Sequence, residues 1–300
     1  MDDKIPVTIV TGFLGSGKTT IIQNVVKSIW DKEKVAIVKN EIGDVGVDAL
    51  ELSSPKLQVT ELANGCICCT LVGALDDAVR EIVKSYSPDR LIIEASGLAK
   101  PAQIVIALEL VPEVCVDGVI VVVDTLNYKK LTEIEKAWSS QIQSEFIDLY
   151  IFNKVDQISD DILDAIKDDI LMLKPSARII ETNDADIPAS LIFGLHPSNL
   201  AYEIDAHEDH DHAEFSSFSI EDLSITSIDR VQNILETLPK CIYRAKGFFS
   251  SNSTNYIMNM VAGKVVISIT QKELPSSSKF VFIGLDIEKY KEKIETKLRN

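Results

Sequence analysis

A glycine-rich run near the start of the chain, ending in a lysine and a threonine, is the first set of residues that could carry chemistry. It fits the pattern G-x-x-x-x-G-K-[ST], with the fixed positions filled by Gly12, Gly17, Lys18 and Thr19. Glycines let successive backbone N–H groups turn inward around a phosphate, and a helix N-terminus adds partial positive charge. The pattern predicts a loop that binds a nucleoside triphosphate, with Lys18 on the β- and γ-phosphates and Thr19 on Mg²⁺. The predicted loop residues are Gly12, Gly15, Ser16, Gly17, Lys18, Thr19 and Thr20.

A second run, Asn153-Lys154-Val155-Asp156, directly follows a short apolar stretch and could choose the base. A carboxylate can accept hydrogen bonds from two neighbouring N–H groups, a pair that guanine offers and adenine does not. We expect Asp156 to be that acceptor, Asn153 to hold the loop, and the stem of Lys154 to lie over the ring. A plain polar turn between a strand and a helix is the alternative. A position downstream of a phosphate loop favours GTP.

Hydrolysis needs an acidic residue beside Mg²⁺ and a group that positions water. Glu94 ends a strand-like run and is followed closely by Gly97, whose backbone amide could sense a γ-phosphate. Asp124 ends the next apolar run and is the rival acid, although a helix cap is the interpretation that we slightly favour for it. The expected catalytic residues are therefore Lys18, Glu94 and a further acid, Glu41.

Three of the five cysteines, Cys66, Cys68 and Cys69, lie within four positions of one another. Three thiolates so close can converge on one soft metal ion, and Zn²⁺ binds thiolates in a tetrahedron. We expect a zinc site here, with Glu41 as a candidate fourth ligand. The alternatives are a redox pair of Cys66 with Cys69, and cysteines with a structural role only.

The remaining cysteines and a histidine tract carry weaker signals. Cys115 and Cys241 stand alone among apolar residues, which favours buried roles as small hydrophobic groups. Three of the four histidines lie in the tract His207-Glu208-Asp209-His210-Asp211-His212. This tract could collect divalent metal weakly, and a solvated acidic linker is an equally favoured interpretation.

Composition limits the class of protein. The 300 residues include 30 basic and 46 acidic side chains, and the net charge of −16 excludes binding to nucleic acid or an anionic membrane by bulk charge. No apolar run approaches the ~18 residues that a membrane-spanning helix needs. The acidic start does not resemble a signal peptide, and an odd number of cysteines argues against a disulfide framework. We therefore expect a soluble cytoplasmic protein.

The elements that must position these residues alternate along the first two-thirds of the chain. β-branched runs predict strands at Val7–Val10, Val35–Val38, Leu57–Thr60, Leu91–Ile93, Val119–Val123, Leu149–Phe152 and Arg178–Ile180. Amphipathic stretches predict helices at Lys18–Trp30, Ala74–Tyr86, Pro101–Leu110, Tyr128–Glu145, Asp160–Leu173 and Pro188–Leu195. This alternation predicts an α/β fold, namely a doubly wound, mostly parallel P-loop sheet covered by helices on both faces.

The pattern changes after Gly194. We expect a P-loop domain over residues 1–195, an acidic, histidine-containing linker over 196–213, and a smaller α+β domain over 214–300. The smaller domain is predicted to have an antiparallel sheet. Its expected elements are Phe215–Ile220, Ile228–Leu238, Cys241–Ala245, Thr254–Val261, Lys264–Ile269, Lys279–Ile283 and Asp286–Leu298.

These motifs, in this order, resemble the CobW-like family of P-loop GTPases, whose relatives include the urease and hydrogenase metal chaperones. The resemblance covers nearly the whole chain. It rests on Thr11 to Thr20, Asn40 to Gly43, Gly65 to Cys69, Glu94 to Leu98, Asn153 to Asp156 and Arg244 to Gly247. It implies a protein that hydrolyses GTP with Mg²⁺, binds Zn²⁺, Co²⁺ or Ni²⁺ through the cysteines, and transfers the metal to a client metalloprotein. Histidine-rich linkers are common in the family.

The chain departs from the family pattern outside the nucleotide and metal signatures. Val72 and Ala74 stand where Arg and Asp are usual, Lys100 replaces Asp before a proline, and Ile42 replaces Phe. The leading interpretation is a slow GTPase whose nucleotide state gates a thiolate metal site. A metal-buffering protein with vestigial hydrolysis and a P-loop kinase for a small molecule are the alternatives. A homodimer is one assembly that the sequence allows.

Overall fold

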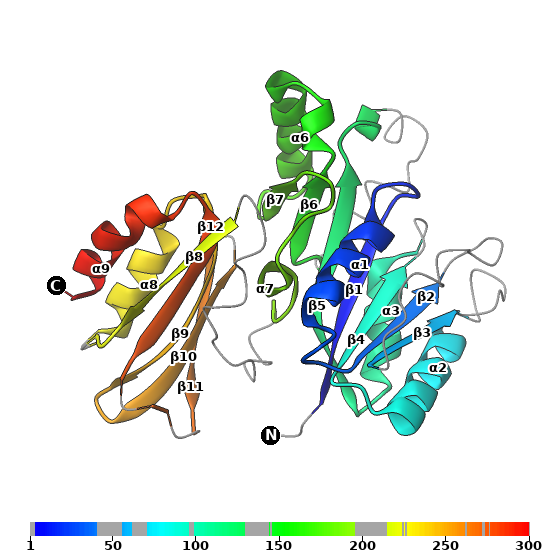
Figure 1. The fold of residues 1–300 in the computed structure, drawn as a ribbon, viewed down its shortest axis with the longest axis horizontal. Helices are drawn as coiled ribbons and strands as arrows, with labels where there is room; N and C mark the ends of the chain where they lie inside the picture. Colours follow the sequence, from blue (N-terminus) through cyan, green and yellow to red (C-terminus); the bar gives the residue numbers. More distant parts are fainter. Residues whose placement is uncertain are drawn as a thin grey trace. The chain divides into compact units, whose positions relative to one another are not determined.

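The structure is a computed structural model that describes residues 4–40, 56–61, 71–95, 99–129, 144, 146–195, 215–223, 225, 227–261, 263–271, 274–275 and 277–299. The chain divides into two compact units, Met1–Phe193 and Gly194–Asn300 (Figure 1). Within the described residues, no helix is both long enough and apolar enough to cross a membrane.

The first unit is built on a seven-stranded sheet with the order β3-β2-β4-β1-β5-β6-β7. Every pairing between neighbouring strands of this sheet is parallel. The strands are β1 (Ile5–Gly12), β2 (Val35–Asn40), β3 (Leu57–Glu61), β4 (Arg90–Ala95), β5 (Val114–Asp124), β6 (Leu149–Asn153) and β7 (Ile179–Thr182). The predicted parallel α/β sheet is therefore confirmed.

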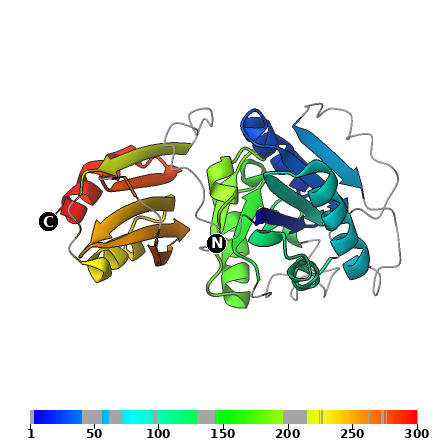
Figure 2. The ribbon, with the colours of Figure 1, turned by 90° about the horizontal axis from the view of Figure 1, so that it is seen from below.

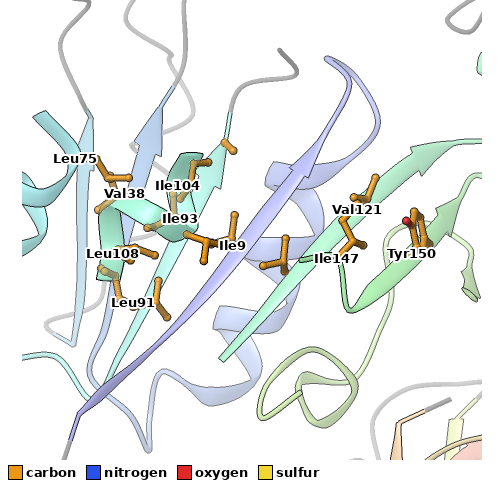
Figure 3. Close-up of a cluster of buried hydrophobic side chains, with 14 of the residues drawn as sticks. Ile9, Val38, Leu75, Leu91, Ile93, Ile104, Leu108, Val121, Ile147 and Tyr150 are labelled. Atoms are coloured by element: carbon orange, nitrogen blue, oxygen red, sulfur yellow. The ribbon is translucent and has the colours of Figure 1, made fainter. Parts of the chain in front are cut away.

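Helices cover both faces of this sheet, as its β-branched, two-sided apolar strands require. They are α1 (Lys18–Ile29), α2 (Leu71–Tyr86), α3 (Pro101–Glu109), α6 (Asp160–Leu173) and α7 (Ala189–Ile192), together with a 3-10 turn, Val155–Gln157. Figure 2 shows α1 and α3 on opposite faces. Buried side chains of α2, α3 and α6 join one cluster with alternate residues of the strands (Figure 3). That cluster includes Ile9, Val38, Ile93, Val121 and Tyr150, and burial raises the pKa of the Tyr150 phenol.

A buried ion pair ties the amino ends of β4 and β5 together. Arg90 is fully buried, and its guanidinium lies 3.2 Å from the carboxylate of Asp117 and 3.0 Å from that of Glu33. Asp117 lies at a bulge, where the register against β1 shifts and the side chain is re-aimed. The ring of Phe193 lies 3.9 Å from the same guanidinium. This network joins β4 to β5 across β1, which lies between them in the sheet.

The second unit is a five-stranded antiparallel sheet with the order β11-β10-β9-β12-β8. Its strands are β8 (Phe215–Glu221), β9 (Ile242–Ser251), β10 (Thr254–Val261), β11 (Lys264–Thr270) and β12 (Lys279–Leu285). Helices α8 (Ile228–Glu236) and α9 (Lys291–Arg299) lie on one face of the sheet (Figure 1). Their apolar residues pack with Phe218, Phe249, Phe280 and Phe282. The expected smaller α+β domain with an antiparallel sheet is confirmed.

Several predicted element bounds are wrong, and packing explains them. The helix predicted at Pro188–Leu195 ends at Ile192, because Phe193 adopts extended backbone and packs its ring on Arg90. The strand predicted at Cys241–Ala245 continues to Ser251, because β10 and β12 pair with its two edges. The last helix begins only at Lys291, after a 3-10 turn, Glu288–Tyr290.

Two further expectations on these elements have other outcomes. Cys115 and Cys241 were expected to be buried, but both are half-buried. Most of the predicted helix Tyr128–Glu145 lies outside the described residues, and so does the linker over 196–213.

Candidate nucleotide-binding site

The carboxyl ends of four adjacent strands meet at one edge of the first unit's sheet. β4, β1, β5 and β6 are neighbours in that order, and their final residues are Ala95, Gly12, Asp124 and Asn153. In parallel α/β sheets, ligands bind at this edge. The predicted phosphate loop follows β1 here, and the predicted base loop follows β6.

Two glycines of the phosphate loop are required by close backbone approach. Gly12 has φ +138°, and a Cβ there would lie 2.3 Å from the carbonyl oxygen of Val122. Gly17 has φ +101°, and a Cβ there would lie 2.3 Å from the side-chain nitrogen of Asn153. A side chain at either position would strain the backbone and push apart the strands or loops that form the site.

The lysine of the loop is folded back over the loop itself. Lys18 begins α1, is 7% exposed, and donates from Nζ to the carbonyl oxygens of Gly12 and Phe13, at 2.9 Å each. The Oγ hydroxyl of Ser16 is buried without a hydrogen-bond partner. A buried hydroxyl without a partner costs free energy, so this hydroxyl and the ammonium suit an anionic ligand.

Thr19 and Glu94 meet beside the loop. The Thr19 hydroxyl donates to Oε1 of Glu94 at 2.6 Å, although the two residues are 75 positions apart in the sequence. Glu94 is 4% exposed, and its second oxygen, Oε2, is buried without a hydrogen-bond partner. A buried carboxylate oxygen without a partner is costly, and hard cations such as Mg²⁺ take oxygen ligands. The two residues therefore fit the predicted magnesium position.

Asn153 holds two loops together. Its side-chain Nδ2 donates to the carbonyl oxygen of Ser16 at 2.9 Å, and its Oδ1 accepts from the backbone N–H of Ala185 at 3.2 Å. The loop of Ala185, in which Asp184 and Ala185 both have positive φ, was not among the predicted site residues. The turn-forming run Asn183-Asp184 directly after a strand was the signal that could have found it.

Lys154 links the base loop to the phosphate loop and to β5. Its Nζ lies 2.7 Å from Oδ2 of Asp124 and donates to the carbonyl oxygen of Gly15, also at 2.7 Å. Its backbone has φ +66°. The next turn carries Asp156, which is exposed, as an acceptor for an incoming base must be.

Asp124, the rival acid, is occupied by other partners. It is 3% exposed and accepts from the backbone N–H of Asn127 at 3.1 Å, from that residue's side-chain amide at 3.0 Å, and from Lys154. Burial alone would raise the pKa of Asp124, but these hydrogen bonds and the ammonium of Lys154 outweigh it and hold that pKa below its ordinary value. The hydrogen bond that Asp124 accepts from the backbone N–H of Asn127, three residues later, has the pattern of a helix N-cap. Glu94 is thus the acid that keeps an oxygen available beside the phosphate loop.

Other predicted residues lie away from these contacts or outside the described chain. Thr20 is exposed on the first turn of α1. The predicted site residues that lie outside the described residues are Glu41, Cys66, Cys68, Cys69, Gly97, His207, His210 and His212. Among the residues that the structure does describe, no group of three His, Cys, Asp or Glu side chains could hold a metal ion.

Comparison with known proteins matches both units. Residues 6–181 match the family model described as CobW/HypB/UreG, nucleotide-binding domain, and residues 215–300 match the cobalamin synthesis protein cobW C-terminal domain. The zinc chaperone CobW of Sinorhizobium sp is 32% identical over 294 residues, which cover 82% of this chain and 81% of that protein.

Two further similarities are weaker. The zinc-regulated GTPase metalloprotein activator 1 of Schizosaccharomyces pombe is 33% identical over 194 residues, 60% of this chain and 46% of that protein. A crystal structure of a zinc-bound triple mutant of the YjiA GTPase aligns over 99% of both chains with a TM-score of 0.50 and 23% identity, which supports the fold. The family models, the relative that aligns over most of this chain, and the loops gathered at the sheet edge agree, and the chain belongs to the CobW/HypB/UreG family of P-loop proteins.

Proposed function

We propose that this protein is a GTP-hydrolysing metallochaperone, which binds Zn²⁺ through Cys66, Cys68 and Cys69 and delivers it to a client metalloprotein under control of the bound nucleotide. The names of its relatives, a zinc chaperone and a zinc-regulated GTPase, support the metal and the nucleotide. The observation that carries the proposal is the hydrogen bond from Thr19 to the buried Glu94 beside the phosphate loop.

The phosphate side of the proposal assigns a role to each residue at this edge. Backbone N–H groups of the loop and the ammonium of Lys18 would bind the β- and γ-phosphates. Thr19 and Glu94 would hold Mg²⁺, which neutralises charge on the phosphate oxygens when bound. Glu94, with Glu41, is the candidate for positioning the attacking water, and Gly97 for sensing the γ-phosphate.

The base side of the proposal uses the loop after β6. Asp156 is exposed and carries the acceptor oxygens that guanine requires. Asn153 is fully engaged in holding the loop, and Lys154 has its ammonium fixed. GTP and GDP are therefore the proposed ligands.

The metal side of the proposal rests on residue types and on where the neighbouring strands end. Three thiolates leave one tetrahedral position for Glu41, another side chain or water, which permits exchange with a client. In the sequence, Glu41 directly follows β2, and the cysteines follow β3. Both strands end at the edge that carries the phosphate loop. Zn²⁺ is the proposed cargo, and Co²⁺ and Ni²⁺ are the competing ions.

The remaining parts of the proposal concern the chain as a whole. The GTPase domain spans 1–195, the acidic linker 196–213 and the smaller domain 214–300. The cytoplasm, where thiols stay reduced, is the proposed compartment. A client metalloprotein is the proposed partner, with a homodimer as the proposed assembly.

Coupling between nucleotide and metal is the test. If the γ-phosphate and the metal bias the same loops, Zn²⁺ affinity must differ between the GTP and GDP states, and linkage requires the reciprocal effect on nucleotide affinity. We expect a difference of about 5-fold to 150-fold. Competition titrations of the reduced protein against a chromophoric chelator, with GDP and with a non-hydrolysable GTP analogue, measure it for Zn²⁺, Co²⁺ and Ni²⁺.

A variant that replaces Cys66, Cys68 and Cys69 by Ser is the control for the site. It should lose chelator-resistant Zn²⁺ while still binding GTP. Equal metal affinity in the two nucleotide states would contradict gated delivery and favour the buffering alternative. Retained zinc in the serine variant would move the metal site elsewhere in the chain.

A further inference from the structure

Asp124 is a buried acid at the edge of the sheet where the carboxyl ends of the strands meet, and the proposed GTP hydrolysis does not use it. Its carboxylate is 3% exposed and accepts hydrogen bonds from Asn127 and from the ammonium of Lys154, the latter at 2.7 Å. Both oxygens are thereby engaged, so Asp124 does not offer the kind of spare oxygen that Glu94 keeps. A buried carboxylate that is paired this closely acts through its partner.

Its partner, Lys154, is held at two points. The ammonium contacts Asp124 and donates to the carbonyl oxygen of Gly15 in the phosphate loop, both at 2.7 Å. A lysine side chain loses rotamer entropy when it is fixed. Lys154 also has φ +66°, a backbone conformation that non-glycine residues adopt rarely. Part of the cost of ordering this residue is thus met before any ligand arrives.

The segment after β5 holds the base loop at a second point. Thr125, the neighbour of Asp124, donates from its hydroxyl to the carbonyl oxygen of Asn153 at 2.8 Å. Its backbone N–H donates to the same oxygen at 3.2 Å. Residues at the end of β5 therefore hydrogen-bond to both Asn153 and Lys154, which lie shortly before Asp156, the proposed acceptor for guanine.

We infer that Asp124 is a positioning residue for guanine binding, which holds the stem of Lys154 where it will lie over the ring of a guanine nucleotide. This inference rests on the proposed function, because it takes the loop after β6 as the base site. The physical gain is preorganisation: a side chain already ordered costs less free energy to use in binding. The ligand class is a guanosine diphosphate or triphosphate.

A double-mutant cycle tests the inference in the full chain. Asp124→Asn keeps the shape of the side chain and removes its charge, and Lys154→Met keeps an apolar stem and removes the ammonium. Asp124→Asn alone should weaken both GTP and GDP about tenfold by calorimetric titration, since the two nucleotides share the base. In the Lys154→Met background, the same substitution should cause no further loss.

Asp117→Asn is the matched control, because Asp117 is equally buried on the same strand and pairs with Arg90 at the other end. It should lower the thermal midpoint without changing GTP affinity. Full GTP affinity in Asp124→Asn would overturn the inference, and so would an undiminished loss in the Lys154→Met background. If Asp124→Asn does not fold, Asn127→Ala should give a smaller loss that also vanishes with Lys154→Met. Failure of the unaltered protein to bind GTP would instead refute the proposed function.

Discussion

The two ends of β5 carry the same chemistry and use it differently. Asp117, near the amino end, is 1% exposed and pairs with the fully buried Arg90. Asp124, at the carboxyl end, is 3% exposed and pairs with Lys154, which is 24% exposed. The first pair joins one strand to another. The second joins a strand to two loops.

This difference separates a contact that stabilises the fold from one that shapes a site. Around Arg90, a second carboxylate and an aromatic ring also contact the cation. At the carboxyl end, Glu94 Oε2 and Ser16 Oγ are left buried without hydrogen-bond partners. An unsatisfied buried group costs ~1–3 kcal/mol, which a ligand can recover. The comparison teaches that two equally buried carboxylates on one strand can differ in what they join: Asp117 pairs with another strand, and Asp124 pairs with a lysine that also contacts the phosphate loop.

The substitution with the largest expected effect disrupts the ion-pair network of Arg90 at the amino end of β5. Asp117→Asn leaves the buried guanidinium of Arg90 with Glu33 as its remaining described carboxylate partner, and removing one member of a buried pair costs roughly 3–5 kcal/mol. We expect about 3 kcal/mol of lost unfolding free energy in urea titrations, at the low end because Glu33 remains. A loss below about 1 kcal/mol would mean that the two ends of β5 do not differ as described.

A substitution with an intermediate expected effect tests whether the loop at the carboxyl end of β6 binds guanine. Asp156→Asn should weaken GTP by about 2–3 kcal/mol, because one charge-assisted pair of hydrogen bonds to guanine is lost. It should also shift preference toward xanthosine triphosphate, whose ring presents an acceptor at the altered position. Affinities for both nucleotides, measured side by side, check this. Since Asp156 is exposed, the unfolding free energy of the Asp156→Asn variant should stay within about 0.5 kcal/mol of that of the unaltered protein.

The smallest effect is the pH dependence of stability that Asp124 contributes. Its pKa in the folded protein lies below the ordinary value of 3.8, so it binds fewer protons folded than unfolded. Its stabilisation is therefore complete above the ordinary pKa and is lost as pH falls through the lowered one. Urea titrations from pH 5 downward should show a steeper decline for the unaltered protein than for Asp124→Asn. Parallel declines would show that the ion pair with Lys154 is absent in solution.

Local patterns in the sequence were enough for the architecture. Apolar β-branched runs alternating with amphipathic stretches predict parallel strands and covering helices, because a parallel sheet buries both faces. The bounds of β6 and α6 follow closely from such runs. The predicted bounds of an element were wrong where contacts with residues distant in the sequence set its end. Phe193 packs against Arg90 and ends α7 early, and β9 is longer than predicted because strands pair with both of its edges.

The sequence by itself was enough to predict the phosphate loop and the base loop, because the chemistry of each is carried by contiguous residues whose spacing is set by the backbone. The sequence favoured Glu94 over Asp124, but only the tertiary structure shows that Glu94 keeps a buried oxygen without a hydrogen-bond partner while both oxygens of Asp124 are engaged, since this depends on partners 75 and 30 residues away. It also shows that the side chain of Asn153 hydrogen-bonds to both Ser16 and Ala185, and that Asp117 pairs with Arg90 whereas Asp124 pairs with Lys154. The physical reason is that hydrogen-bond satisfaction is a property of packed neighbours, and strands distant in the sequence become neighbours only in the folded sheet.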